Sequence, residues 1–306
     1  MEFFRKTNFD FQGKRRIAYI VSASLIIIGI ISLIFHGGPR LSIDFTGGLS
    51  MRLQFEKPVS EAEVRDALSK IGAPSAEVKI IKEMGEEPEI LIRVQSKTAG
   101  GNYQEELSAD LRQIFIDNPF EIRSVDSVGA RIGEELATSA VLAVFVTLLL
   151  ILIYLSWRFE FRFGVGAVVA LFHDVLIVLG FFSLLNLEIS LAVVAAFLTL
   201  VGYSLNDTIV VFDRIRENLK KHSAMTLKEI INLSINETLS RTIITGSTTL
   251  MVVVILFFFG GQVIHDFSFA LLVGIVIGTY SSIYIAAPVL LEWGKQEALK
   301  KKRISR

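Results

Sequence analysis

Residues 189–212 read ISLAVVAAFLTLVGYSLNDTIVVF, an apolar run of 24 residues in which Asp207 is the only formal charge. At about 1.5 Å per residue, a helix of this length crosses a hydrocarbon layer about 30 Å thick. Asp174 is the only formal charge in the five similar runs, which are residues 17–35, 137–157, 163–185, 242–259 and 267–291. The pattern predicts a polytopic α-helical membrane protein with six transmembrane helices.

The composition narrows the class of protein further. The chain has 306 residues, 52% of them hydrophobic, with 31 basic and 31 acidic side chains and no cysteine. A soluble core does not need six long uncharged runs, so a wholly soluble enzyme is excluded. A chain without cysteine has no disulfide, no thiol chemistry and no cysteine-based metal site. The neutral charge balance argues against nucleic acid as a partner.

Lysine and arginine predict the orientation in the membrane. Basic side chains gather in residues 1–16, 158–162, 213–241 and 292–306, whereas the links 186–188 and 260–266 have none. Because cytoplasmic loops carry the excess of basic residues, we expect both termini in the cytoplasm and residues 36–136 on the other side. No small-x-small cleavage pattern follows the first run, which favours an uncleaved helix over a signal peptide.

Residues 36–136 contain the pattern of a small α+β domain. Apolar and polar residues alternate over 51–56, which predicts a half-buried strand, and Ser60 with Glu63 forms a capping box for a helix. The remaining predicted elements are strands at 77–82, 89–95 and 120–128 and a helix at 103–115. The resulting order, β-α-β-β-α-β, is the ferredoxin-like arrangement. The carboxylates lie on helix faces and turns, so we expect a binding or docking module without catalytic activity.

Asp207 is the first candidate for a functional residue. It lies about 8 Å from the cytoplasmic end of its run. An aspartate at the centre of a transmembrane helix costs about 2.5–3.5 kcal/mol on insertion scales. Such a residue by default faces the bundle interior and marks an ion path, and opposing effects of burial and a nearby cation allow proton exchange near neutral pH. The alternative is a structural hydrogen bond between helices.

Arg241 is the candidate cation for Asp207. It stands at the inner edge of the fifth run, one to two helical turns from the depth of Asp207. Thr245, Thr248 and Thr249 follow on one helical face, which predicts a hydroxyl-lined stripe. We therefore predict a proton relay of Asp207, Arg241 and Thr245, with Asn206 as a further hydrogen-bonding member. The alternative for Arg241 is an anchor at the membrane interface.

His173 and Asp174 form a secondary polar pair at the midplane of the third run. Neighbours on a helix point about 100° apart and no third ligand is evident, so we expect no metal and no cofactor. The alternative to a functional role is a packed polar pair at a helix contact. On the cytoplasmic side, an apolar stripe from Leu227 to Leu239 predicts an interfacial helix at about 225–240.

Three motifs carry a family resemblance. They are SIDFTGG at 42–48, VGARIGEEL at 128–136 and VGYSLNDTIVVFDRIREN at 201–218. They resemble the motifs of the SecF family of protein-export membrane proteins, which belongs to the resistance-nodulation-division superfamily. Ala130 stands where many members have proline. The architecture is also similar: one span, a large domain at 36–136, and five spans within 137–291 before the basic tail 292–306.

The resemblance implies an auxiliary, non-enzymatic subunit in the plasma (inner) membrane of a prokaryote. Such a subunit pairs with SecD beside the SecYEG channel and uses the proton-motive force to help pull an unfolded polypeptide outward. By the same resemblance, Asp207 is similar to the proton-carrying aspartate, Arg241 to its basic partner and Thr245 to a polar neighbour. In the motif that contains Asp44, the pair Gly47-Gly48 resembles a hinge, and a simple turn is the alternative.

Rival functions remain open at this point. One is a subunit of a proton-driven pump for small molecules or lipids, although such pumps carry two repeats in one chain and this chain has one. Another is a passive membrane scaffold, in which the intramembrane polar groups only hold helices together. An intramembrane serine hydrolase is disfavoured, because Tyr203-Ser204 lacks the glycine-flanked elbow of a nucleophile.

Overall fold

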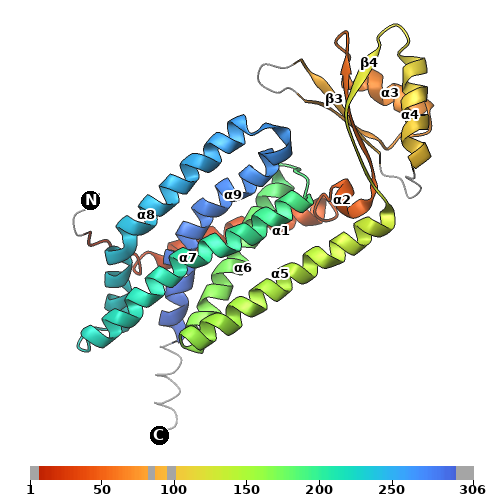
Figure 1. The fold of residues 1–306 in the computed structure, drawn as a ribbon. Helices are drawn as coiled ribbons and strands as arrows, with labels where there is room; N and C mark the ends of the chain where they lie inside the picture. The colour runs from red at the N-terminus through yellow and green to blue at the C-terminus, as the bar shows by residue number, and fades with distance from the viewer. Residues whose placement is uncertain (1–6, 82–86, 95–100, 294–306) are drawn as a thin grey trace.

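The computed structural model describes residues 7–81, 87–94 and 101–293. A bundle of long helices makes up most of the molecule, and a small sheet domain projects from one end of it (Figure 1). The elements in chain order are α1 (Arg15–Phe35), α2 (Ile43–Thr46), β1 (Gly48–Phe55), α3 (Glu61–Lys70), β2 (Glu77–Ile81), β3 (Glu89–Val94), α4 (Gly101–Ile114), β4 (Phe120–Val128), α5 (Ala130–Arg158), α6 (Phe161–Leu184), α7 (Leu191–Lys221), α8 (Leu227–Phe259), α9 (Gly261–Ser281) and the π-helical turn η1 (Ser282–Ala286).

The sheet domain has the predicted ferredoxin-like topology. Its four strands are antiparallel in the order β2-β3-β1-β4, so β1 lies between β3 and β4. Met51 in β1 is paired with Ile92 in β3 and with Val125 in β4. Side chains from β1, β3, α3 and α4 form the core, including the fully buried Leu53 and Leu68.

Local signals set the boundaries of the elements in this domain. The capping box at the start of α3 is confirmed, because the Glu63 amide donates to Ser60 Oγ at 3.3 Å and the Ser60 amide donates to Glu63 Oε2 at 2.9 Å. The strand predicted at 120–128 matches β4. The predicted strands at 77–82 and 89–95 correspond to β2 and β3, while Lys82 and Gln95 fall outside the described residues.

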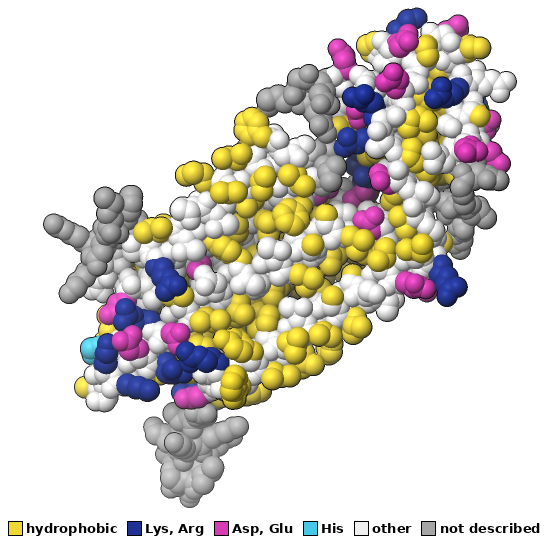
Figure 2. Space-filling model, in the orientation of Figure 1, with side chains coloured by type: hydrophobic (Ala, Val, Ile, Leu, Met, Phe, Trp, Pro, Cys, Tyr) yellow, Lys and Arg dark blue, Asp and Glu magenta, His cyan; other side chains and the backbone are white. Residues whose placement is uncertain are grey.

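Within the described ranges, six helices are long and apolar enough to span a membrane, as the sequence predicts. Helices α7, α8 and α9 pack against one another, α1 packs against α6, and α5 packs mainly against α6. Hydrophobic side chains cover the middle of the bundle in Figure 2, and basic side chains gather at its end away from the sheet domain. Helix α5 lies at the periphery, and no residue in its most apolar 18-residue window is buried within the chain.

Several helices extend beyond the apolar runs that predict them. Helix α7 continues past residue 212 to Lys221. Helix α8 is continuous from Leu227 to Phe259, so the predicted interfacial helix at 225–240 and the predicted span at 242–259 are two parts of one helix. The reason is local: a capping box of Thr226 and Glu229 starts the helix, and neither glycine nor proline occurs between residues 227 and 245.

Small residues let α1 and α6 approach very closely. A Cβ added to Gly29 in α1 would lie 2.7 Å from the Cα of Gly180 in α6, so the two backbones touch at this point. One turn further along, the hydroxyls of Ser32 and Ser183 hydrogen-bond at 2.8 Å. Close packing of small residues is a main source of helix association in membranes.

Candidate functional site

Asp207 is buried inside the bundle, on helix α7. It is 3% exposed, and its Oδ2 atom has no hydrogen-bond partner among the described residues. A buried carboxylate is costly unless a counter-charge or a proton compensates it. Arg241 on α8 lies near enough for its charge to act on Asp207. The charge of Arg241 therefore acts on Asp207, but no ion pair or hydrogen bond joins the two side chains among the described residues.

The other two predicted relay members lie in different positions. Thr245 is half-buried on α8, and its backbone carbonyl accepts a hydrogen bond of 3.0 Å from the hydroxyl of Tyr203. Tyr203 lies one turn before Asp207 on α7, so it links the two helices beside the carboxylate. Asn206 is exposed on the outer side of α7, and Arg241 is exposed on α8.

The threonine hydroxyls of the stripe form their hydrogen bonds mainly within α8. Thr248 Oγ1 donates to the Thr245 carbonyl at 3.0 Å, and Thr249 Oγ1 donates to the same carbonyl at 3.1 Å. Such bonds to a preceding carbonyl are common for threonine in helices. These two hydroxyls are therefore satisfied within α8 and do not form a line of donors that leads to Asp207.

Asp174 is the centre of a second buried polar cluster. Its Oδ2 atom accepts hydrogen bonds from Ser204 Oγ at 2.7 Å and Ser281 Oγ at 2.8 Å. Its Oδ1 atom lies 2.9 Å from Nδ1 of His173, although the two residues are neighbours on α6. On the other side of the ring, His173 Nε2 lies 2.9 Å from Ser22 Oγ of α1. The cluster thus connects α1, α6, α7 and α9.

Close helix packing brings Ser204 to this cluster. A Cβ added to Gly278 on α9 would lie 3.0 Å from the Cβ of Ser204. A Cβ at Gly274, one turn earlier, would lie 2.6 Å from the Leu200 side chain. The two glycines therefore set the separation of α9 and α7. Within the described ranges, no group of three or more His, Asp or Glu side chains is placed to hold a metal ion.

The base of the sheet domain is joined to the start of α7. We call the contact between residues 40–44 and residues 186–191 the joint. Its backbone bonds are from Ser42 N to the Ile189 carbonyl at 3.0 Å and from Ile189 N to the Arg40 carbonyl at 2.8 Å. The Asp44 carboxylate accepts a bond of 2.9 Å from Leu191 N, the first helical amide of α7. A carboxylate at a helix N-terminus satisfies an unpaired amide and complements the helix dipole.

Charged side chains reinforce the joint. Glu188 precedes α7 and contacts Arg93 of β3 and Arg40, the latter at 3.0 Å. Arg40 also contacts Glu77 of β2. Partial burial acts to raise the pKa of Glu77, but hydrogen bonds and charges from Arg40 and Lys79 outweigh it and lower the pKa to about 2. Glu77 therefore stays ionised and holds Arg40 at ordinary pH.

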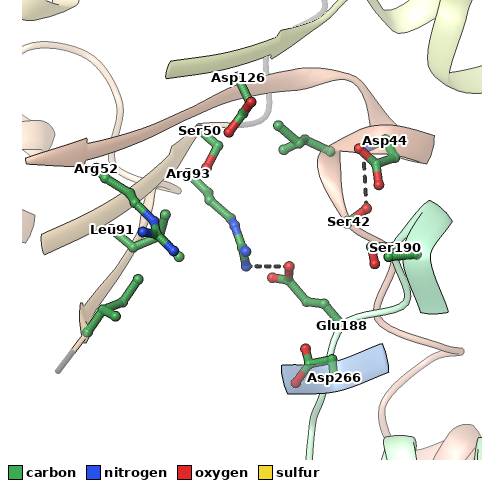
Figure 3. A pocket seen from close by; sticks show the side chains of 13 residues that line it. Ser42, Asp44, Ser50, Arg52, Leu91, Arg93, Asp126, Glu188, Ser190 and Asp266 are labelled. Atoms are coloured by element: carbon green, nitrogen blue, oxygen red, sulfur yellow. Dashed lines mark hydrogen bonds and ion pairs between the residues drawn. The ribbon is translucent and has the colours of Figure 1, made fainter. Parts of the chain in front are cut away.

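A cavity of about 280 Å³ lies between the sheet and the bundle at this point. In Figure 3, Arg93 reaches across it from the sheet to Glu188, and Asp266 at the start of α9 faces it from the bundle side. The uncovered face of the sheet contributes Ser50, Arg52 and Arg93, while helices α3 and α4 lie on the other face (Figure 1). Nine of its thirteen lining residues are polar or charged, and the contact of Arg93 with Glu188 joins its two sides.

The glycine pair Gly47-Gly48 makes the turn from α2 into β1. Both residues have positive φ, 73° and 140°, which favours glycine. A Cβ at Gly47 would lie 2.6 Å from the Cα of Ala130, where α5 begins. The chain therefore enters and leaves the sheet domain at one closely packed crossing, and Gly133 one turn into α5 packs against the Phe45 carbonyl.

Comparison with known proteins agrees with this architecture. The family described as "Protein export membrane protein SecD/SecF, C-terminal" matches residues 109–296, and the family described as "SecD/SecF GG Motif" matches residues 32–59. The chain belongs to the SecD/SecF family. Within this family it is similar to proteins named "Protein translocase subunit SecF".

The SecF of Thermodesulfovibrio yellowstonii is 46% identical over 97% of this chain and 98% of that protein. The SecF of Rhodothermus marinus is 46% identical over 99% of this chain and 98% of that protein. The crystal structure of SecDF from Thermus thermophilus superposes with a TM-score of 0.82 at 39% identity, over 94% of this chain. This chain spans 39% of that SecDF chain, so it corresponds to a part of the solved protein.

Sequence reasoning missed several residues of the candidate site. Tyr203 and Ser204 lie one turn before Asp207, so helical periodicity could have indicated them. Ser22, Tyr280 and Ser281 lie on distant helices, and no local pattern sets them apart from other small polar residues in apolar runs.

Proposed function

We propose that this SecF-family chain is an auxiliary subunit of the protein-export machinery. It pairs with a SecD partner beside the SecYEG channel and uses the proton-motive force to promote translocation of an unfolded polypeptide across the plasma membrane. The observation that carries the proposal is the buried Asp207 carboxylate, with an oxygen that no described residue hydrogen-bonds and with Arg241 nearby. A titratable group in this setting is suited to binding and releasing a proton.

The exposed polar residues beside Asp207 support a partner within the membrane. Asn206 and Arg241 face outward from α7 and α8. Because lipid tails offer no hydrogen-bond partner, polar groups exposed beside Asp207 favour a second protein that covers them in part. The partner that we propose is SecD, because the solved SecDF chain is more than twice as long as the segment that this chain matches.

The joint supplies a route from Asp207 to the sheet domain. Asp207 and the amide that Asp44 caps belong to the same helix, α7. When a proton binds or leaves Asp207, the packing of α7 against α8 and α9 changes, and the start of α7 carries the joint with it. We therefore propose that proton binding moves the sheet domain, which acts on the emerging polypeptide.

The orientation is part of the proposal. Basic side chains at the end of the bundle away from the sheet domain support a cytoplasmic position for that end. Glu121 on β4 and Lys220 at the end of α7 are both exposed and lie at opposite ends of the molecule. A cysteine at residue 121 should be labelled by an impermeant reagent from outside intact cells, and one at residue 220 should not. The reverse pattern would contradict the orientation.

The decisive experiment replaces Asp207 with asparagine, which keeps the shape and removes the titratable group. Inverted vesicles with this variant should lose the stimulation of secretion by a proton gradient, while translocation driven by the channel motor continues. Asp213→Asn is the matched control, because Asp213 is an exposed carboxylate on the same helix. Full gradient-dependent stimulation with the Asp207→Asn protein would favour the scaffold function instead.

A further inference from the structure

A chain of hydrogen bonds beside Asp174 has only one consistent set of donors. The Tyr280 hydroxyl lies 2.7 Å from the carbonyl of Ala18, which can only accept, so Tyr280 donates its single hydrogen there. Ser22 Oγ lies 3.0 Å from the Tyr280 oxygen and must therefore supply the hydrogen of that contact. Since the Ser22 hydrogen is used, the contact of 2.9 Å between Ser22 and His173 requires a hydrogen on Nε2 of His173.

The other end of the cluster fixes a second hydrogen. Oδ2 of Asp174 accepts hydrogen bonds from two serine hydroxyls, so its hydrogen bonding is complete without a proton of its own. Ser281 Oγ is also 3.1 Å from the Gly278 carbonyl, but its contact of 2.8 Å with Asp174 Oδ2 is the shorter of the two. The contact of 2.9 Å between Asp174 Oδ1 and His173 Nδ1 needs one hydrogen, on either atom.

These two hydrogens determine the charge of the pair. A neutral imidazole carries one N–H, which is already placed on Nε2, so the hydrogen between Nδ1 and Oδ1 is an additional proton. The pair is then either imidazolium with carboxylate or neutral imidazole with carboxylic acid, and its net charge is zero in both forms. Asp174 is 1% exposed and His173 is 6% exposed. A net charge at this depth would be costly, and a neutral pair avoids that cost.

We propose that His173 and Asp174 form a second proton-binding site of the bundle, which holds one proton between the imidazole and the carboxylate. The titratable side chain that faces it is Tyr280, whose ring stacks on His173, and Asp207 lies one turn beyond Ser204 on α7. From α1 and α9 it is faced by Ser22 and Ser281. Loss of the proton to solvent leaves one negative charge on the pair.

A role of this site in transport rests on the function proposed above. The presence of a proton on the pair does not rest on it. Ser204 donates to Asp174 and lies three residues before Asp207, so one helix contacts both proton-binding groups. Release of the proton from the pair leaves a net negative charge beside the hydroxyl of Ser204 on α7. The two sites therefore act on the same helix.

The chain contains its own control for the effect of burial. His265 and Asp266 are also neighbours on a helix, and His265 Nδ1 lies 3.0 Å from Asp266 Oδ1. Their side chains are 37% and 35% exposed, and solvent can hydrate either charge. In spectra of the full chain, this pair is the solvent-exposed reference for His173 and Asp174.

The test is spectroscopy of the full chain in lipid nanodiscs. Nitrogen NMR of ¹⁵N-histidine protein, assigned with His173→Gln, should show His173 at neutral pH either as imidazolium or with its only proton on Nε2. In the second case, infrared spectra should contain a protonated-carboxyl band that disappears in Asp174→Asn. A neutral His173 without that band would overturn the proposal. Asp207→Asn should keep the signature, so a failure of the transport assay and a failure here are separate results.

A second variant tests the order of donors from Tyr280 through Ser22 to His173. Tyr280→Phe removes the acceptor of the Ser22 hydrogen, which is then free to be donated to Nε2 of His173. The pair should release its proton at a pH lower by about one unit, the shift that corresponds to one net hydrogen bond. Tyr284→Phe removes a hydroxyl from the neighbouring ring and should leave the titration unchanged. An unchanged midpoint in Tyr280→Phe would contradict the donor order.

Discussion

Loss of the Asp44 carboxylate should release the sheet domain from the bundle while the helices stay folded. In Asp44→Ala, the Leu191 amide loses its acceptor, which costs about 1 kcal/mol as for other helix caps. Helix α7 also loses a negative charge at its positive end, which costs about 0.3–1 kcal/mol. The total of about 1–2 kcal/mol raises the ratio of released to docked molecules roughly 5- to 30-fold.

Ser190→Ala is the matched control for this variant. Ser190 Oγ accepts from Val193 N at 3.3 Å, so its removal weakens the same helix start by a similar amount. That bond lies within α7, however, and does not cross the joint. An effect of helix stability alone would appear equally in both variants, whereas a release of the joint would appear only in Asp44→Ala.

The assay is a distance measurement between two spin labels. The chain has no cysteine, so labels can be placed at Glu121→Cys on β4 and at Leu185→Cys at the end of α6, which are both exposed. Pulsed EPR in nanodiscs should give one dominant distance for the parent and for Ser190→Ala. Asp44→Ala should add a second, longer population. Coincident distributions for all three proteins would refute the reasoning about the joint.

Two further outcomes follow from the same region. Gly47→Ala should strongly reduce the thermal stability of the purified protein, because its Cβ would lie 2.6 Å from the Ala130 Cα. Gly37 also has a positive φ, but nothing lies within 4 Å of an added Cβ, so Gly37→Ala should lose only the roughly 1–3 kcal/mol of stability that backbone strain costs. The pKa of Glu77 is lowered from 4.5 to about 2, so its contact with Arg40 should stabilise docking of the sheet domain on the bundle above pH 4.5. This stabilisation should fade as the pH falls toward 2. Glu77→Gln should remove the pH dependence of the EPR distances.

The sequence predicts the spans well because their signal is local. A run of about 20 uncharged residues has few alternatives to a transmembrane helix, and the capping box at Ser60 and Glu63 is contained in four residues. The proximity of Asp207 and Arg241 is predictable from depth alone, since both depths follow from counting residues along adjacent runs. The continuity of α8 was missed because a change in hydrophobicity at residue 241 is not a helix stop.

The parts that the sequence does not predict depend on register between helices. Ser204 and Ser281 meet at Asp174 only because Gly274 and Gly278 set how α9 lies against α7. Glu188 is an unremarkable carboxylate in a three-residue link, and its two arginine partners are about 95 and 150 residues away. No local pattern carries such information, because these contacts form only after the tertiary structure is in place.

The contact of Gly29 with Gly180 has a consequence for the order in which the protein is assembled. Helix α1 leaves the ribosome first, yet the surface that matches its glycine is made roughly 150 residues later, which takes about 8–30 s at common rates of synthesis. During that time α1 lies in the lipid without its partner. A larger side chain at either glycine would therefore leave insertion intact and expose the newly made protein to membrane proteases at the stage when the two helices first meet.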